Sequence, residues 1–233
     1  MADVRTFAVL LPAAGSGSRF GGGDKLLVDL AGRSVLQRSV ELFAQRADVG
    51  AIVIVTAPER FADYREHLKG IVMEPRLQFV AGGRERWESV LFGLRFIGGL
   101  KPLPEFVAIH DAARPLTPAE VIEEAFAVTR ERGAALPCMA EPATLKRQDA
   151  AGCVSETVDR RGLFQAQTPQ CFDLPKLRAG FESLLAAGKL ADVTDDAQVF
   201  ERTGLAVPIT AGSPLNLKIT TAADVELARA IVK

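Results

Sequence analysis

Residues 10–26 read LLPAAGSGSRFGGGDKL and join an apolar run to a glycine-rich loop that ends near a lysine. The run over residues 7–11 is continuous and apolar, which is typical of a strand buried on both faces. The loop after it contains five glycines and two serines. Few side chains shield its backbone, so its N–H groups can approach an anion closely. The stretch therefore predicts a phosphate-binding loop after the first strand, with Arg19 and Lys25 as its cations.

Two common phosphate-binding motifs do not fit this loop. A P-loop requires Gly-Lys-Ser/Thr, but Lys25 stands in the sequence DKL. The dinucleotide fingerprint G-x-G-x-x-G fits at Gly15 and Gly17, but Phe20 occupies the position of its third glycine. Taken alone, the loop is also compatible with a plain glycine turn between a strand and a helix.

Composition limits the possible partners. The 233 residues include 28 Lys and Arg and 29 Asp and Glu, so no basic excess favours nucleic acid. The apolar run near the N-terminus is too short for a signal peptide or a membrane span. Three cysteines and two histidines lack metal-like spacing. We expect a single domain over residues 1–233 that is soluble and cytoplasmic, contacts neither nucleic acid nor membrane, and binds small anions.

Apolar runs alternate with amphipathic segments along most of the chain, which predicts an α/β fold. We expect a Rossmann-like, mostly parallel twisted sheet with helices on both faces, and N-caps at Ser34, Thr117 and Thr221. The expected strands are 7–11, 51–55, 77–80, 106–109, 134–139, 205–209 and 217–220, and the later helices include 117–132, 175–187 and 194–203. Ligands bind beyond the carboxyl ends of such strands. The glycine loop and HDAARP, residues 110–115, should therefore share one crevice.

Residues 141–168 break this alternation. Two short polar strands, 143–147 and 154–158, flank a turn and predict a β-hairpin arm that projects from the domain. A lone hairpin is only marginally stable, so it needs a partner surface. A second copy of the chain is the simplest partner, which predicts a homodimer through the arm.

Several motifs together resemble those of one enzyme family. The segments LLPAAGSGSRF, AGGRERWESV, HDAARP, TVDR, QTPQ, TDDA and NLKIT occur in the order found in the 2-C-methyl-D-erythritol 4-phosphate cytidylyltransferases, the IspD family. The resemblance spans residues 4–233. It departs from the family at Asp24-Lys25-Leu26, where Pro-Lys-Gln is usual, and at Arg84, where Asp is frequent.

This resemblance implies cytidylyl transfer from CTP to methylerythritol phosphate, with release of pyrophosphate, in non-mevalonate isoprenoid synthesis. The attacking phosphate oxygen is already anionic, so no general base is required. Catalysis then consists of positioning two anions and neutralising charge at the α-phosphorus. We accordingly look for cations rather than for a Ser-His-Asp set.

The resemblance also implies roles for individual residues. Arg19 and Lys25 would stabilise charge at the CTP phosphates, and Arg160 and Lys218 would grip the phosphate of the second substrate. The implied nucleotide-binding residues are Ala13, Ala14, Gly15, Gly17, Gly82, Gly83, Ser89 and Asp111. The other implied substrate-binding residues are Thr144, Thr168 and Thr194. Asp111 would hold Mg²⁺ or another divalent cation.

Some of these residues have a simpler structural interpretation. Asp111 could cap the turn that follows it, and Thr194 could cap a helix. Arg160 could be an arginine on the arm surface, or it could reach the active site of a partner. Arg86 is a weaker candidate, for which a surface role is equally compatible. We expect His110 to be a satisfied core group rather than a base.

Two other functions remain open. A cytidylyltransferase for another polyol phosphate, such as ribitol 5-phosphate, would share the loop and the basic residues. A non-catalytic nucleotide-binding regulatory protein would not need a second phosphate grip. The chain ends one helix after Asn216, so we expect no cyclodiphosphate synthase domain of the kind that some relatives carry.

Overall fold

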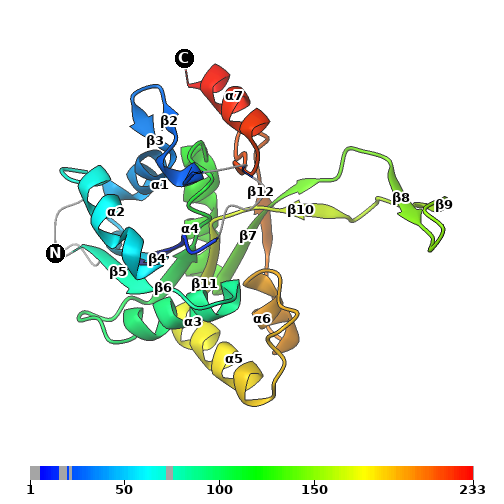
Figure 1. Cartoon of the computed structure of the whole chain (residues 1–233). Helices are drawn as coiled ribbons and strands as arrows, with labels where there is room; N and C mark the ends of the chain where they lie inside the picture. The colour runs from blue at the N-terminus through cyan, green and yellow to red at the C-terminus, as the bar shows by residue number, and fades with distance from the viewer. Residues whose placement is uncertain (1–5, 16–19, 21–22, 72–75, 233) are drawn as a thin grey trace.

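The computed structural model describes residues 6–15, 20, 23–71 and 76–232, and a mostly parallel sheet organises it (Figure 1). The strands are β1 (Phe7–Pro12), β2 (Asp29–Leu30), β3 (Arg33–Ser34), β4 (Val49–Thr56), β5 (Leu77–Ala81), β6 (Phe106–Ile109), β7 (Ala134–Ala140), β8 (Leu145–Gln148), β9 (Val154–Val158), β10 (Phe164–Ala166), β11 (Gln170–Asp173) and β12 (Ile209–Ala211). The helices are η2 (Lys25–Leu27), α1 (Val35–Ala44), η3 (Pro58–Arg60), α2 (Phe61–His67), α3 (Arg86–Ile97), α4 (Ala119–Arg132), α5 (Leu174–Ala186), α6 (Ala197–Arg202) and α7 (Ala222–Ile231).

The strand order confirms the predicted Rossmann-like sheet. The order is β10-β7-β11-β6-β1-β4-β5, with β12 paired to β7. β1 pairs in parallel with both β4 and β6, and β5 extends the parallel set beyond β4. β11 then inserts antiparallel between β6 and β7. Because the parallel strands end at the same edge, the loops that follow β1, β5 and β6 meet there.

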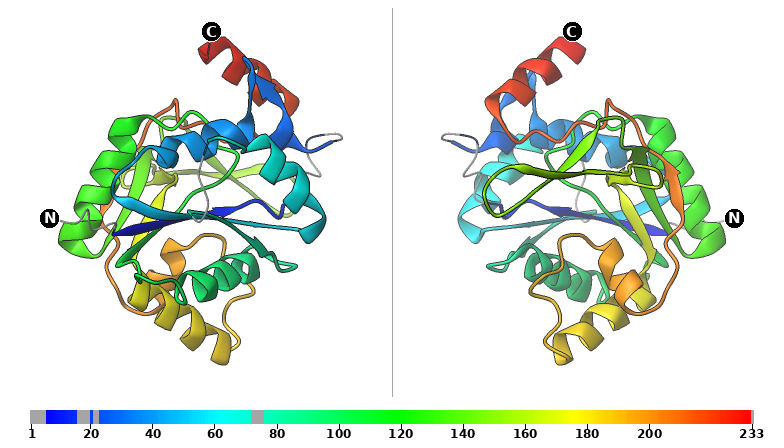
Figure 2. Two further views of the ribbon diagram at one scale, coloured as in Figure 1. Left: turned by 90° about the vertical axis from the view of Figure 1, so that its left-hand side faces the viewer. Right: turned by 90° about the vertical axis from the view of Figure 1, so that its right-hand side faces the viewer.

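Helices cover both faces of the sheet, as the continuous apolar strands predict (Figure 2). The side chains of Phe7, Val9 and Leu11 pack in one core cluster with α1, α4 and α7. Those of Ala8 and Leu10 pack in a second cluster with α3, α5 and α6. This alternation follows from the period of two along a strand. It fixes β1 at the centre of the domain and places the start of the glycine loop at its edge.

Two of the three predicted N-caps are confirmed. The side chains of Ser34 and Thr221 each accept a hydrogen bond from a backbone N–H three residues ahead, within a capping box. The prediction for Thr117 is wrong, because Pro118 is the N-cap of α4. The Thr117 hydroxyl instead donates to Asn216 Oδ1 at 2.8 Å. A tertiary contact has replaced the local cap.

Three predicted elements near the C-terminus differ in the structure. No strand forms over residues 217–220, where the chain runs without regular structure and Ile219 N donates to the carbonyl of Ala113 at 2.8 Å. The strand expected at 205–209 lies later, as β12. The helix expected over 194–203 shortens to α6. In each case contacts with distant segments, rather than the local apolar pattern, set the bounds.

The arm projects from the body as a hairpin of β8 and β9 (Figure 1). It is shorter than the predicted 141–168, because β10 already pairs with β7, with Phe164 opposite Ala140 and Ala166 opposite Cys138. Thr168 is buried in the body of the domain. The chain therefore leaves the body after β7 and has returned to it at β10.

None of the described helices has both the length and the apolar character that crossing a membrane would require.

Candidate active site

A cleft of about 210 Å³ opens beyond the carboxyl ends of β1, β5 and β6. It is lined by residues 12–15, 23–26, 83–86 and 111–113, together with Arg60, Ser89 and Lys218. The glycine loop and HDAARP thus contribute to one crevice, as the sequence predicts. The tail segment after Asn216 adds Lys218 from the far end of the chain.

Most of the predicted cleft residues are brought together. The cleft wall contains Ala13, Ala14, Gly15, Lys25, Gly83, Ser89, Asp111 and Lys218. Gly17 and Arg19 lie outside the described residues. Gly82 packs behind the wall, where a Cβ atom would come within 2.8 Å of the Ala14 Cβ and 3.1 Å of the Ser89 hydroxyl. Only glycine permits this close approach of β5 to the end of β1.

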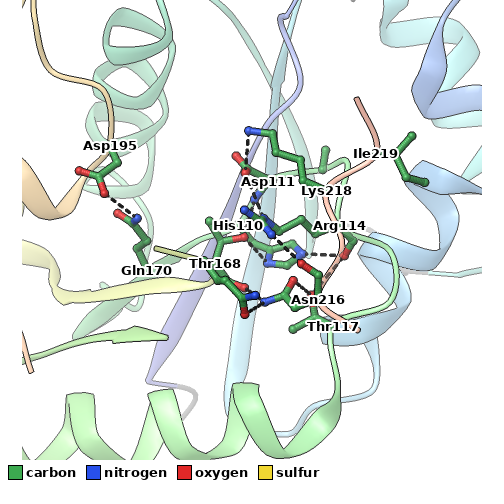
Figure 3. Close-up of polar contacts among 12 residues, drawn as sticks. His110, Asp111, Arg114, Thr117, Thr168, Gln170, Asp195, Asn216, Lys218 and Ile219 are labelled. Carbon is green, nitrogen blue, oxygen red and sulfur yellow. Dashed lines mark hydrogen bonds and ion pairs between the residues drawn. The ribbon is translucent and has the colours of Figure 1, made fainter. Parts of the chain in front are cut away.

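Asp111 is the anionic centre of the cleft (Figure 3). Its Oδ2 accepts from Lys218 Nζ at 2.9 Å and from Arg114 Nε at 3.3 Å. Burial raises the pKa of Asp111, but the charges of Lys218, Arg114 and Arg86 outweigh burial and hold the pKa well below its usual range. The carboxylate therefore stays ionised in the cleft at any physiological pH.

His110 lies directly behind Asp111 and is fully buried. Its Nε2 lies 3.1 Å from the Arg114 carbonyl oxygen, and its Nδ1 lies 3.0 Å from the Thr168 hydroxyl. Since a carbonyl oxygen can only accept, the neutral ring carries its proton on Nε2. Burial lowers the pKa of His110 to about 4. His110 is thus the satisfied core group that the sequence predicts.

Asn216 ties HDAARP to the tail segment and was not predicted as a site residue. Its Nδ2 donates to Gln167 Oε1 at 3.1 Å and to the Thr168 carbonyl at 2.7 Å. Its own carbonyl accepts from Arg114 Nη1 at 2.6 Å, while its Oδ1 accepts from Thr117. These bonds place Lys218, two residues later, beside Asp111. The motif NLKIT contained the only sequence signal for this role.

Lys25 contacts the tail segment directly beside Lys218. Its Nζ donates to the Ile219 carbonyl at 3.1 Å. Lys25 begins η2, a single 3-10 turn whose Leu26 is buried. Residues 194 positions apart in the chain therefore meet at the cleft wall.

Arg86 also contributes to the cleft, so the surface interpretation is wrong. Its guanidinium makes a bidentate pair with Asp196, at 3.0 Å from Nη1 to Oδ1 and 2.6 Å from Nη2 to Oδ2. Asp196 is fully buried, and its backbone N–H donates to Gln170 Oε1. Arg86 thereby fixes the loop before α6 against the cleft. Burial raises the pKa of Asp196 despite the opposing charge of Arg86.

Comparisons with known proteins identify the family. The sequence model described as IspD, 2-C-methyl-D-erythritol 4-phosphate cytidylyltransferase, matches residues 7–233. A protein of that description from Rhodopirellula baltica is 38% identical over 234 aligned positions, covering 97% of this chain and 94% of the relative. The chain belongs to the IspD family.

Other IspD relatives agree with this assignment. A bifunctional IspD/IspF enzyme from Rhodopseudomonas palustris is 39% identical over 221 positions, which are 94% of this chain and 53% of that enzyme. The chain thus spans about half the length of this bifunctional relative. The crystal structure of 4-diphosphocytidyl-2C-methyl-D-erythritol synthase from Anaerococcus prevotii superposes with a TM-score of 0.83 at 27% identity, and 98% of each chain is covered. The IspD structure from Francisella tularensis gives 0.81 at 26% identity, covering 97% of this chain and 99% of that one.

The structure does not bring every predicted IspD site residue into the cleft. Thr144 and Arg160 are exposed on the arm, where Arg160 Nη1 donates to the Pro142 carbonyl. Thr168 is buried, and its hydroxyl accepts from Asp111 N at 3.2 Å. Thr194 is exposed before α6 and accepts from Gln198 Nε2 at 2.7 Å, not as the N-cap of that helix. None of these four lines the cleft within the described part of one chain.

The described residues supply few ligands for a divalent cation. Among the described residues, no group of three His, Cys, Asp or Glu side chains could hold a metal ion. Mg²⁺ is commonly held by one or two carboxylates together with substrate phosphates. The ionised Asp111 supplies one such carboxylate. The cleft therefore fits Mg²⁺ in company with a nucleotide, and not as a closed protein site.

Proposed function

We propose that this chain transfers the cytidylyl group of CTP to 2-C-methyl-D-erythritol 4-phosphate. An oxygen of the acceptor phosphate forms a bond to the α-phosphorus of CTP. The bond from that phosphorus to the bridging oxygen breaks, and pyrophosphate leaves with the electron pair. The products are 4-diphosphocytidyl-2-C-methyl-D-erythritol and pyrophosphate. No proton is moved, which agrees with the buried and neutral His110.

One observation carries this proposal: Lys25 and Lys218, from opposite ends of the chain, line the same cleft around Asp111. Two cations in one cleft suit two phosphates that must approach one another. Lys25 neutralises charge on the CTP phosphates, a role that the family resemblance also implies for Arg19, and Lys218 receives the acceptor phosphate. Asp111 would hold Mg²⁺ together with the nucleotide phosphates, and the bound cation would screen the triphosphate charge.

The nucleotide lies along the wall of small residues that starts at Ala13 and Ala14. Backbone groups there, and at Gly83, meet the base and the ribose, while Ser89 supplies a hydroxyl. The Ser89 side chain already accepts from Gly83 N at 3.0 Å, which holds these two residues together. The small side chains of these residues leave room for the cytosine ring beside the backbone.

The arm of a second copy of the chain completes the binding site for the acceptor. Thr144 and Arg160 are exposed on the arm, away from the cleft of their own chain. Apolar side chains are also exposed on β9 and β10, with Val154 66% and Phe164 47% accessible. Burying these side chains against a partner would stabilise a homodimer. Arg160 of each arm would then bind the acceptor phosphate in the other protomer's cleft. Thr194 would contact the hydroxyl groups of the acceptor.

The test is pyrophosphate release from CTP, measured with methylerythritol phosphate, with ribitol 5-phosphate and with neither. We expect release that depends on methylerythritol phosphate, and loss of release in Lys218→Ala. Lys69→Ala is the matched control, because Lys69 is 78% exposed on the surface. Release only with ribitol 5-phosphate would assign the other polyol. CTP binding without turnover by any acceptor would instead indicate a regulatory protein.

A further inference from the structure

The turn that carries Lys25 is anchored in an unusual way. Asp24 precedes Lys25 where the family usually has proline. Its Oδ1 accepts from Leu26 N at 3.0 Å and caps η2, and its carbonyl accepts from Leu27 N at 3.0 Å. A proline side chain could not accept a hydrogen bond from Leu26. In this chain, a carboxylate therefore holds the turn that starts at Lys25.

The second oxygen of Asp24 reaches a different element. Oδ2 accepts from the Tyr64 hydroxyl at 2.6 Å and pairs with Arg60 Nη1 at 3.1 Å. Arg60 Nη1 also lies 3.2 Å from the Tyr64 oxygen. Tyr64 is fully buried on α2, so this contact is built into the core. One carboxylate thus joins the Lys25 turn to the segment that follows β4.

The charges in this cluster are consistent with a fixed anchor. Burial, followed by the hydrogen bond to Asp24, raises the pKa of Tyr64 far above neutral pH, so its hydroxyl remains a donor. Hydrogen bonds to an ionised acceptor are stronger than those between neutral groups. Arg60 balances the charge of Asp24, and both residues line the cleft. Lys25 is then held from two directions, through its backbone by Asp24 and through its ammonium by the Ile219 carbonyl.

We propose that Asp24 and Tyr64 are positioning residues for Lys25, which fix its turn at the cleft wall. The inference rests on the proposed function, since it takes Lys25 as a cation for the CTP phosphates. Small displacements of such a group have large effects on rate. Neither side chain needs to touch the substrate itself.

A double-mutant cycle tests this proposal. Tyr64→Phe should lower kcat about tenfold and change the KM for CTP less than about twofold. In a Lys25→Ala background the same change should lower kcat less than about twofold, because the group it positions is gone. Glu59→Gln, an exposed neighbour, is the control and should leave kcat unchanged. Equal losses in both backgrounds, or no loss in the native background, would overturn the inference.

Amide hydrogen exchange gives a readout that does not depend on turnover. Tyr64→Phe should speed exchange at Leu26 and Leu27 about tenfold while the thermal midpoint changes little. Asp24→Asn, which keeps the shape and loses the charge, should shift the same two amides. Unchanged exchange at both amides would overturn the anchor even in an active enzyme. A native protein that fails to turn over CTP would overturn the proposed function and leave the anchor to be judged by exchange.

Discussion

The cleft wall and the arm hold their polar side chains in opposite ways. Asp111 is nearly buried, with its side chain 13% exposed, and it pairs with Lys218 from a segment more than 100 residues away. On the arm, Arg147 pairs with Glu156 across one hairpin, and both side chains are more than half exposed. The cleft geometry is therefore fixed by the fold of one chain. The arm carries its residues outward, where we propose that a partner completes its geometry.

The largest effect is expected at the cleft wall. Lys25→Ala should lower kcat by about 10²- to 10³-fold, because a cation for charge developing at the α-phosphorus is removed. Steady-state kinetics should show this loss while the circular dichroism spectrum and thermal midpoint stay near those of the native protein. The matched control is Lys69→Ala, on the surface. Unchanged turnover would mean that the cleft is not the catalytic site.

The buried histidine should make stability depend on pH. His110 has a pKa of about 4 in the folded chain and about 6.5 when unfolded, so the folded state binds fewer protons between these values. Its contribution is complete above pH 6.5 and falls as the pH drops towards 4. The total loss should be about 3 kcal/mol. Asp111, whose pKa is lowered, adds a further loss only below about pH 4.

Urea unfolding between pH 7 and pH 4 measures this dependence. His110→Gln should unfold at lower urea at pH 7 but show a flatter profile from pH 6.5 to pH 4. Parallel profiles for the two proteins would contradict a neutral, desolvated ring behind Asp111.

Arg160 tests whether the arm works across a dimer. Arg160→Ala should lower kcat/KM for methylerythritol phosphate by about 10- to 100-fold, the usual cost of a charged hydrogen bond to phosphate. Mixing equal amounts of Arg160→Ala and Lys25→Ala proteins should restore about a quarter of native activity. Half the dimers would then be mixed, each with one complete site. Sedimentation equilibrium should show a dimer at micromolar concentration, and absence of rescue in such dimers would place Arg160 with its own cleft.

The smallest effect is expected on the arm surface. Glu156→Gln removes the partner of Arg147, and it should change the free energy of unfolding by less than about 0.5 kcal/mol, because both side chains are solvated. Urea unfolding at pH 7 measures the change. A decrease in the free energy of unfolding above about 1.5 kcal/mol would show that this ion pair stabilises the arm. The arm would then not differ from the cleft in how its charged side chains are held.

The central sheet could be predicted because its strands are continuous apolar runs. The run over residues 7–11 packs on both faces, and its period of two leaves no alternative burial. Local signals were weaker where the chain was short of apolar residues. Residues 217–220 resemble a strand locally, yet Ile219 bonds to the Ala113 backbone and no strand forms.

The candidate site likewise contains residues that the sequence could predict and residues that it could not. The place of Asp111 and Lys218 in the cleft could be predicted from motifs of the family resemblance, and that of Lys25 from its position at the end of the glycine loop. Asn216 and Arg86 were missed or undervalued, because their partners are distant in sequence. No spacing in the sequence relates Arg86 to Asp196, which lies 110 residues later.

The sequence by itself determined the alternation of strands and helices up to the strand expected at 134–139, the glycine loop at a strand end and the supply of cations. These follow from apolar periodicity and from the residue types that phosphates require. The tertiary structure alone decided that Asp111 lies against Lys218, that Asp24 is bound to Tyr64, and that Arg160 lies apart from the cleft. The physical reason is that such contacts depend on how distant segments pack, and the energy of a charge depends on what burial places around it.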